Sequence, residues 1–434
     1  MASLKYFHRS NRWLARAFEL LTLLFVVITP LLYLSVDHWI TNTSIIACLL
    51  ILMGYFLNKY DAVPWKDRLV IGAIGFSTIY IVAILISQFG RGNFNYKELL
   101  DQNRWIVAIP FLIFIYSRKI NYVSILDWVL PICVLLSFIS STYFIPSDAW
   151  GDRYTISFMD PLAYGFINLA LAMYCLASAL VDFKWRTFNF NFILKAIGVL
   201  VGVYLSIKTG SRSGWFALPF VVVFLIFNLY SEVKSKLLLG LIFASSSLLA
   251  IYFLSGSVNA RINLLFSEVW EYPWYGGVAP ETSIGLRITF YRLGAYYFSQ
   301  SPVFGWGLRG FESIKDDPHV AMFATPFARD FAMGTLFHSE WTTQAVQFGV
   351  LGLLGVFYVF LFPLIVFYKY RNLNYLSRRI YLVGFSYVFV MIVASIGDEV
   401  FHSKGMITFY AVIVIGLIAT LVVQINAQKV IVKS

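Results

Sequence analysis

Long apolar runs joined by short polar segments make up most of this chain. Runs close to the roughly 20 residues that a helix needs to cross a bilayer recur along it and predict twelve transmembrane helices. The predicted spans are residues 17–36, 40–57, 69–89, 102–117, 123–144, 161–181, 192–208, 214–230, 237–255, 341–368, 380–397 and 405–425. The first run is long for a signal-peptide core and lacks a small-residue cleavage pattern, so it is assigned as the first span.

One polar interruption is far longer than the others and reaches from Ser255 to Phe337. A loop of this length without folded structure is unusual, and its aromatic content argues against disorder. Within it, Ser283–Gln300 is predicted to be a helix and Phe304–Gly310 a turn. We therefore expect a folded cap. The chain would divide into transmembrane helices 1–9 (residues 1–255), the cap (256–338) and transmembrane helices 10–12 (339–434).

The composition agrees with an all-α membrane protein. Apolar residues make up 59% of the 434 residues and charged residues 13%, whereas soluble chains carry about 25% charged residues. A net charge of +11 would suit nucleic acid, but excess Lys and Arg in a membrane protein usually lies in cytoplasmic loops, so no nucleic-acid partner is expected. The loops at 117–119 (SRK) and 368–379 (YKYRNLNYLSRR) are basic. This bias predicts that both termini are cytoplasmic and that the cap lies on the far side of the membrane.

Charged residues are rare inside the predicted spans. Glu19, Asp127 and Lys195 lie near span ends, where we expect their side chains to reach the membrane interface. Coupled transporters need ionisable groups at mid-membrane depth, at a cost of roughly 2.5–3.5 kcal/mol each. Here the ionisable residues gather at the outer rim, which favours chemistry at the membrane surface over transport.

The junction after the seventh span carries Lys208 and Arg212 among small residues, in KTGSRSGW. If the span stays helical to its end, the two cations share one side at a spacing of four residues. A guanidinium grips phosphate with two hydrogen bonds, and small neighbours leave backbone N–H groups accessible, so an anion site is predicted. The alternative is a pair of interfacial cations without a ligand.

The predicted helix 283–300 carries Arg287, Tyr291 and Arg292. Its apolar side predicts an amphipathic helix on the membrane surface, from which Arg287 reaches the same rim as Arg212. That side consists of Ile284, Ile288, Tyr291, Ala295 and Phe298. The alternative is an ordinary solvated face.

His338 opens the tenth span. An imidazole titrates near neutral pH, which suits it to accept a proton from a sugar hydroxyl. Glu340 is close enough to orient or tune it, although residues two apart on a helix point to different sides. The alternative is an amphipathic side chain at the interface. Other ionisable residues are expected around it on the outer side: His319, Asp398, Glu399, His402 and Lys404.

Common catalytic and metal-binding motifs are not found in the sequence. It contains no Walker loop, HExxH motif or nucleophile elbow, and no carboxylate cluster with convincing divalent-metal spacing. Cys48, Cys133 and Cys175 fall inside apolar runs and do not form a disulfide or zinc pattern. We therefore expect neither a metal nor a cofactor.

Three segments resemble the O-antigen ligase family, which includes related O-antigen polymerases. They are TGSRSGWFALP at 209–219, SIGLRITFYRLGAYYFSQSPVFGWGL at 283–308 and FHSEWTTQAVQFGVLGLLG at 337–355. The second has the family's Arg and a Ser-Pro-x-x-Gly-x-Gly-like turn, and the third is similar to its His-Asn-Glu and Gly-Leu-Leu-Gly pattern. The resemblance covers about residues 195–370, and Ser339 stands where the family often has Asn.

The resemblance implies a GT-C-type glycosyltransferase in the bacterial inner membrane that works at the periplasmic face. The donor would be an undecaprenyl-diphosphate-linked glycan and, for a ligase, the acceptor a sugar of lipid A–core. Arg212 and Arg287 match the family's diphosphate-binding arginines, and His338 matches its proposed base. We expect Lys208, Arg292, Tyr291 and Glu340 to assist in substrate binding, and the transfer to invert the anomeric centre without a metal.

Three other functions remain open at this stage. A polymerase would use the same donor and extend the lipid-linked glycan instead of acting on lipid A–core. A lipid-linked sugar flippase or another transporter would need charges along a central cavity. A non-enzymatic scaffold would leave the cations of the outer rim unexplained.

Overall fold

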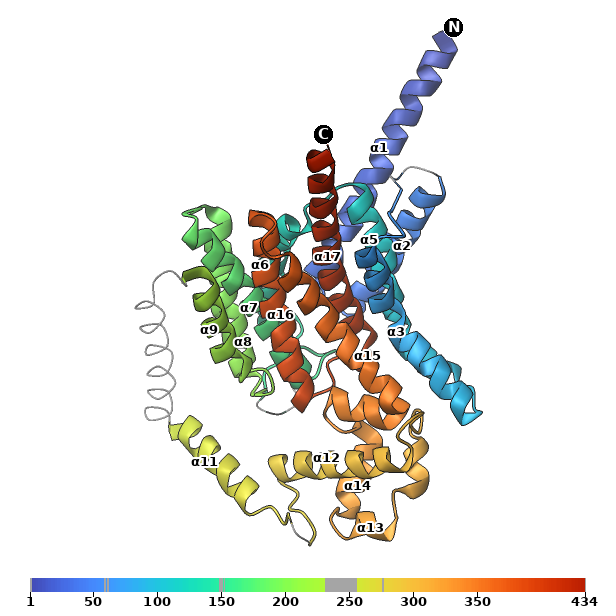
Figure 1. Ribbon diagram of the computed structural model, residues 1–434. Coiled ribbons are helices and arrows are strands. Elements are labelled where there is room, and N and C mark those ends of the chain that lie inside the picture. Colours follow the sequence, from blue (N-terminus) through green and yellow to red (C-terminus); the bar gives the residue numbers. More distant parts are fainter. Residues whose placement is uncertain are drawn as a thin grey trace.

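The computed structural model describes residues 2–57, 60, 62–147, 151, 153–230, 256–274 and 277–433. Figure 1 shows a helical bundle with both termini at one end and a smaller group of helices, the cap, at the other. The bundle contains α1 (Ala2–Leu31), α2 (Trp39–Phe56), α3 (Arg68–Arg91), α4 (Tyr96–Gln102), η1 (Asn103–Val107), α5 (Ala108–Ser117), α6 (Tyr122–Ile139), η2 (Ser140–Phe144), α7 (Pro161–Lys184), α8 (Phe190–Lys208), α9 (Ala217–Tyr230), α15 (Glu340–Tyr370), α16 (Tyr375–Gly397) and α17 (Lys404–Lys433). The cap contains α11 (Gly256–Trp270), α12 (Ser283–Gln300), η3 (Gly310–Ile314), α13 (Pro318–Ala321) and α14 (Pro326–Thr335).

The expectation of an all-α membrane protein is confirmed in the described part of the chain. Nine helices there are long and apolar enough to cross a membrane: α2, α3, the α4–α5 unit, α6 with η2, α7, α8, α15, α16 and α17. The 14 described residues of α9 are apolar and end where the described residues end, and the predicted span 237–255 lies outside the described residues. The predicted helix Ser283–Gln300 is confirmed as α12.

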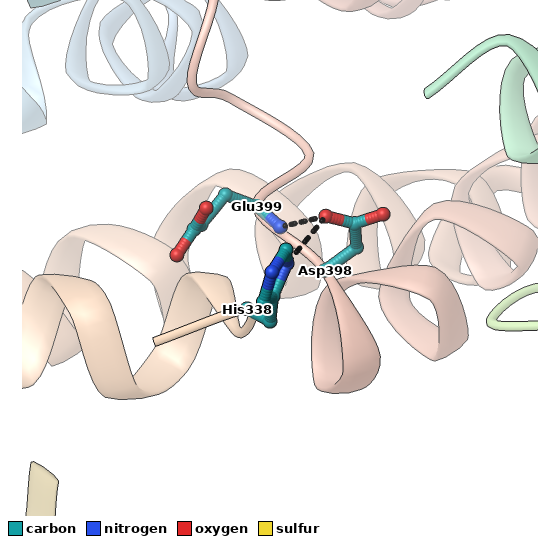
Figure 2. A group of neighbouring side chains, drawn as sticks. All are labelled: His338, Asp398 and Glu399. Carbon is teal, nitrogen blue, oxygen red and sulfur yellow. Dashed lines mark hydrogen bonds and ion pairs between the residues drawn. The ribbon is translucent and has the colours of Figure 1, made fainter. Parts of the chain in front are cut away.

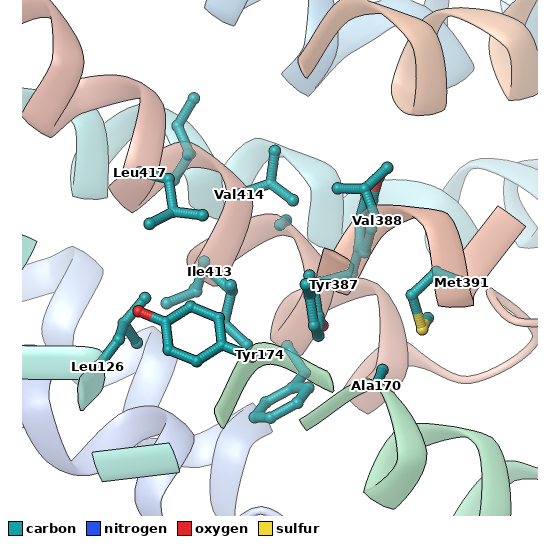
Figure 3. Close-up of a cluster of buried hydrophobic side chains, with 14 of the residues drawn as sticks. Leu126, Ala170, Tyr174, Tyr387, Val388, Met391, Ile413, Val414 and Leu417 are labelled. Atoms are coloured by element: carbon teal, nitrogen blue, oxygen red, sulfur yellow. The ribbon is translucent and has the colours of Figure 1, made fainter. Parts of the chain in front are cut away.

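The bundle is built around α17. This helix is apolar on every side, and a helix of that kind is stable only when other helices surround it. In Figure 3, Ile413, Val414 and Leu417 of α17 pack with Tyr387 of α16 and Tyr174 of α7, all in one buried cluster. The site residues described below lie at or beyond the ends of helices held by this core.

Four charged residues form a closed cluster inside the bundle, near the helix ends opposite the cap. Lys195 Nζ lies 2.6 Å from Asp182 Oδ2 and 3.6 Å from Asp127 Oδ2. The Arg379 guanidinium lies 2.7 Å from a carboxylate oxygen of each of the same two aspartates. All four residues are buried. The cluster therefore joins α6, α7, α8 and α16.

This cluster corrects the expectation that Asp127 and Lys195 reach the membrane interface. Their side chains turn inward because a partner of opposite charge is within reach, and a buried charge is tolerated when it is paired and hydrogen-bonded. Ser178 adds a hydroxyl donor to Asp127 Oδ1 at 2.6 Å. The two acids and two bases neutralise one another in one place and do not line a path, so they do not favour transport.

Helix α15 is broken at Gly349, which has φ of 65° and ψ of −150°. The break frees backbone groups that the turn at residues 302–307 then binds. Trp306 N donates to Val346 O at 2.9 Å, and Gly307 N donates to Gln347 O at 2.7 Å. Non-helical backbone inside a membrane span needs such partners within the protein. The glycine-rich turn thus fastens the cap to α15 through the main chain.

Glycine is required on both sides of this joint. A Cβ on Gly349 would lie 2.3 Å from Val303 O, and one on Gly305 would lie 2.4 Å from Gln347 O. Both glycines also have φ near 65°, a left-handed conformation that other residues adopt at a cost. The close approach of the two backbones explains the Gly-x-Gly pattern of the turn.

The cap has a hydrophobic core of its own, separate from that of the bundle. Its buried members are Phe290, Leu293, Tyr297, Phe311, Val320, Ala324, Ala332, Met333, Phe337 and Val346. Val346 belongs to α15, so the cap core is continuous with the first part of that helix. These aromatic residues explain why the long polar interruption folds.

Replacing Arg379 should destabilise the bundle strongly. In Arg379→Met the two aspartates lose their shared guanidinium, and removing one partner of a buried ion pair costs about 3–5 kcal/mol. The matched control is Arg378→Met, because Arg378 is the exposed neighbour and makes one hydrogen bond, to Asn228 O. Thermal unfolding in detergent should show a much lower midpoint for Arg379→Met than for Arg378→Met. Equal midpoints would contradict the role given to the cluster.

Candidate functional site

The C-terminal end of α16, residues Ile396–Asp398, is where the three family-like segments meet. From α12, the Tyr291 hydroxyl donates to Ile396 O. From the loop after α8, Ser213 Cβ lies 3.5 Å from the position a Cβ on Gly397 would take. His338, just before α15, places Nδ1 3.8 Å from Asp398 Oδ1. Segments more than 40 residues apart in sequence therefore converge on one short stretch of backbone.

The loop after α8 is held in place by small hydroxyl residues. Ser211 N donates to Thr209 Oγ1 at 3.1 Å, and Ser211 Oγ donates to Leu162 O at the start of α7 at 3.3 Å. Gly210 has φ of 67°, which lets the chain turn away from the helix. These contacts fix the backbone on both sides of Arg212, whose side chain is exposed.

Lys208 and Arg212 do not share one side of a helix, because α8 ends at Lys208. Arg212 instead lies in the turn that follows. The Lys208 ammonium is exposed and lies 5.8 Å from the centre of the Tyr204 ring, one turn back along α8. Both cations are still at the cap end of the bundle, but the turn and not the helix sets their relative positions.

Arg287 lies on the side of α12 that faces the end of α16. It is one turn before Tyr291, whose hydroxyl makes the contact to Ile396 O. Burial raises the pKa of Tyr291, so the phenol remains a hydrogen-bond donor at neutral pH. Arg287 is half-buried, and in the described part of the chain no carboxylate forms an ion pair with it. It is therefore suited to an anionic ligand.

The packed face of α12 is not the apolar side singled out in the sequence. Its buried residues are Gly285, Thr289, Phe290, Leu293, Gly294 and Tyr297. Gly294 approaches α15 closely, since a Cβ there would lie 2.0 Å from Thr342 Cγ2. The side from Ile284 to Phe298 is left partly or fully exposed. From this side Tyr291 reaches Ile396 O, and the placement of α12 on the membrane surface stays a prediction.

His338 sits in a strained backbone conformation beside two acidic residues. Its φ is 46°, and Leu336 also has a positive φ of 63°; such strain in non-glycine residues clusters at functional sites. Figure 2 shows the ring facing Asp398, with Glu399 following directly. His338 Nδ1 is buried and accepts or donates no hydrogen bond within the described residues. Nδ1 lies 3.8 Å from Asp398 Oδ1, which is within the range of an ion pair but longer than a direct hydrogen bond, and Nε2 is left for a ligand.

Both acidic residues are held by hydrogen bonds. Asp398 Oδ1 accepts from Glu399 N at 2.9 Å, and Glu399 Oε1 accepts from the Thr343 hydroxyl at 2.8 Å. Burial raises the pKa of Glu399 to about 8, which keeps this carboxyl mostly protonated at neutral pH. Asp398 is then the acidic group that faces His338 with its oxygen.

Potential metal ligands in the described residues gather at this same place. One ligand atom each of His338, Asp398 and Glu399 lies within 4.8 Å of the others. One oxygen of each carboxylate accepts a hydrogen bond, Asp398 Oδ1 from Glu399 N and Glu399 Oε1 from the Thr343 hydroxyl. Asp398 Oδ2 and His338 Nδ1 are buried without a hydrogen-bond partner within the described residues.

Ser339 and Glu340 support the start of α15. Ser339 is its N-cap residue and accepts from Thr342 N at 3.4 Å; Asn would serve equally well at such a position. Glu340 is buried and accepts from Phe401 N at 3.0 Å and from Gln344 Nε2 at 2.9 Å. These bonds tie α15 to the α16–α17 link and point the Glu340 carboxylate away from solvent.

Arg292 lies within the cap. Its guanidinium stacks 4.4 Å from the centre of the Phe323 ring and donates to Pro273 O at 3.4 Å. It thus joins α12 to two connecting segments of the cap. Arg287 and Arg292 are five positions apart, so their side chains point to different parts of the molecule.

The comparison with known families agrees with this geometry. Residues 196–357 match the family model described as O-antigen ligase. This part of the chain is similar to the O-antigen ligase family. The family resemblance expected from the sequence is therefore confirmed. No curated protein matched the chain.

The O-antigen ligase domain runs from α8 into α15 and contains Lys208, Arg212, Arg287 and His338. It supports a membrane enzyme of the ligase or polymerase type, in a multi-pass bacterial membrane protein with lipid-linked glycan substrates. Asp398 lies beyond the matched region, on a link between the last two helices. An acidic pair directly after a predicted span was the only signal for it in the sequence.

The stability of the protein should fall as pH rises, because of Glu399. Its ordinary pKa of 4.5 is raised to about 8 by burial, so the folded state holds a proton that the unfolded state releases between these values. Each pH unit in that window should cost about 1.4 kcal/mol. Glu399→Gln keeps the acceptor for Thr343 and removes the titration. Between pH 5 and pH 9 the thermal midpoint of this variant should decline less than that of the wild type. Parallel declines in the two proteins would contradict the role given to Glu399.

Proposed function

We propose that this protein transfers an O-antigen glycan from undecaprenyl diphosphate to a sugar hydroxyl of lipid A–core, at the periplasmic face of the inner membrane. The observation that carries the proposal is the convergence of the segments bearing Arg212, Arg287 and His338 on Ile396–Asp398. Two guanidinium groups and an oriented imidazole at one rim suit an anionic leaving group and a neutral nucleophile.

In the proposed reaction Arg212 and Arg287 hold the diphosphate. Guanidinium groups bind phosphate oxygens in pairs of hydrogen bonds, and the exposed Lys208 at the end of α8 adds positive charge to the same end of the bundle. Tyr291 fixes α12 to α16 and thereby sets the position of Arg287. Preorganised cations stabilise the charge that grows on the leaving oxygen, usually the largest catalytic contribution.

His338 acts as the general base. The acceptor oxygen attacks the anomeric carbon, its proton moves to His338 Nε2, and the bond from that carbon to the diphosphate oxygen breaks with its electron pair leaving on the diphosphate. Attack opposite the leaving group inverts the anomeric centre. Asp398 is a positioning residue, because its oxygen faces Nδ1 and stabilises the imidazolium that forms.

The transfer assay tests these roles. With purified protein, undecaprenyl-diphosphate-linked glycan and lipid A–core in liposomes, Arg212→Ala and Arg287→Ala should each lower kcat by about 10²–10³. His338→Ala should lower it by about 10²–10⁴, the usual contribution of a general base. The amount of glycan-bearing lipid A–core formed by each variant after a fixed time is compared with that formed by the wild type on gels.

Arg292→Ala is the matched control for Arg287→Ala. Both arginines belong to α12, but Arg292 stacks on Phe323 inside the cap, so its loss should cost less than about tenfold in kcat while lowering the thermal midpoint. Assistance by Arg292 in substrate binding, expected from the sequence, would instead appear as a raised KM for the lipid-linked donor. Full activity in all of Arg212→Ala, Arg287→Ala and His338→Ala would overturn the proposal.

The acceptor separates a ligase from a polymerase, which shares the donor and the chemistry. Similarity of the His338 segment to ligases favours lipid A–core as the acceptor. Deletion of the gene should then leave bare core lipopolysaccharide while long glycan accumulates on the lipid carrier. Core that carries single repeat units after deletion would identify the protein as a polymerase.

A further inference from the structure

A second acid–imidazole pair lies at the cap end of the bundle and has no role in the proposed transfer. Asp160 Oδ2 is 3.8 Å from His402 Nε2, and the two side chains are 28% and 41% exposed. Asp160 precedes α7, and its other oxygen, Oδ1, caps that helix by accepting from Ala163 N at 2.9 Å. Helix capping therefore accounts for one carboxylate oxygen and leaves Oδ2 for another partner.

His402 is held in one orientation. Its Nδ1 lies 2.8 Å from Glu399 O, and a carbonyl oxygen only accepts, so Nδ1 carries the hydrogen. Nε2 is then directed towards Asp160. A separation of 3.8 Å is too long for a direct hydrogen bond but allows one hydroxyl oxygen to lie about 2.8 Å from both atoms. The pair is thus spaced to bind a hydroxyl group between its two members.

The pair adjoins the proposed reaction site on two sides. Glu399, which holds His402 through its carbonyl, donates its N–H to Asp398 Oδ1, the oxygen that faces His338. On the other side, Leu162 at the start of α7 accepts from Ser211, the residue before Arg212. Asp160 therefore lies two residues before Leu162, which contacts the proposed diphosphate-binding loop, and His402 lies four residues after Asp398, which faces the proposed base.

The chemistry of the pair differs from that of the arginines. A carboxylate repels phosphate, whereas it accepts a strong hydrogen bond from a neutral hydroxyl group. Because Nδ1 of His402 already carries a hydrogen, Nε2 complements the carboxylate when it also carries one and, as part of an imidazolium, donates to the oxygen of the same hydroxyl. We propose that Asp160 and His402 form a subsite for a sugar hydroxyl of a substrate. This inference rests on the proposed transfer function and adds to it a place for the glycan next to the place for the diphosphate.

The sugar that binds there belongs either to the lipid-linked donor or to lipid A–core. Binding assays with four probes distinguish these sources without requiring activity: undecaprenyl-diphosphate-linked glycan, undecaprenyl diphosphate, lipid A–core and lipid A. Each is titrated into purified protein in nanodiscs, and Kd is measured for wild type, Asp160→Ser and His402→Asn. Serine keeps the helix cap, and Asn keeps an N–H group for Glu399 O but has no counterpart of Nε2.

Both variants should raise the Kd for one sugar-bearing lipid about tenfold to a hundredfold, the effect of losing a hydrogen bond to a charged group. The Kd for undecaprenyl diphosphate and lipid A should remain at the wild-type value. A change confined to the lipid-linked glycan assigns the subsite to the donor, and one confined to lipid A–core assigns it to the acceptor. Wild-type Kd for both sugar-bearing lipids would overturn the inference.

A matched control is provided by Asp37 and His38 in the link between α1 and α2. This pair has a similar separation of 3.5 Å but is more exposed, at 54% and 77%, and Asp37→Ser should change no Kd. If Asp160→Ser lowers the thermal midpoint, Asp160→Asn is used in its place, because Asn preserves the N-cap of α7.

Weaker binding of undecaprenyl diphosphate and lipid A, to the same extent as that of the glycan lipids, would show that Asp160 and His402 have a structural role only. Failure of the transfer assay in wild type would instead count against the proposed function, since the binding results stand independently.

Discussion

Charges inside a membrane protein must neutralise one another, and this constraint shapes the bundle. Asp127, Asp182, Lys195 and Arg379 come from four helices and can be paired only when all four helices are assembled. Breaking one contact leaves a charge without a partner in an apolar interior, which is far more costly than losing the pair altogether. The cluster therefore specifies which helices are neighbours, while the apolar core around α17 supplies most of the burial.

Helix α16 connects this cluster to the site. Arg379 lies near its start and Ile396–Asp398 near its end, and the α-helix between them is about 26 Å long at 1.5 Å per residue. A stiff helix fixed at one end by ion pairs holds its other end steadily. The three family-like segments all contact that end, so their relative positions depend on the same helix although none of them belongs to it.

The helices could be predicted from the sequence because an apolar run of sufficient length has few other possible structures in a membrane. Arg212, Arg287 and His338 are predicted site residues because the family motifs that mark them lie within short stretches. Asp398 was predicted only to lie near the site. The sequence does not pair it with His338, because the two residues are 60 positions apart and no local pattern links them. The charge cluster could not be predicted for the same reason. The position of Asp127 and Lys195 near helix ends indicates an interfacial side chain, whereas pairing between helices decides where a charged side chain turns. The break in α15 was also missed, since GVLGLLG reads as a continuous helix.

The joint between the cap and α15 is made by main-chain groups, and Ser87 and Glu98 of the bundle add side-chain hydrogen bonds to the main chain of Phe304 and Leu308. Trp306 N and Gly307 N donate to the carbonyls of Val346 and Gln347, and Gly305, Gly307 and Gly349 are required by shape. Side chains elsewhere in the cap can therefore diverge without loosening the attachment. A main-chain attachment of this kind therefore tolerates substitutions on the exposed surface of the cap while the position of the cap on α15 is kept.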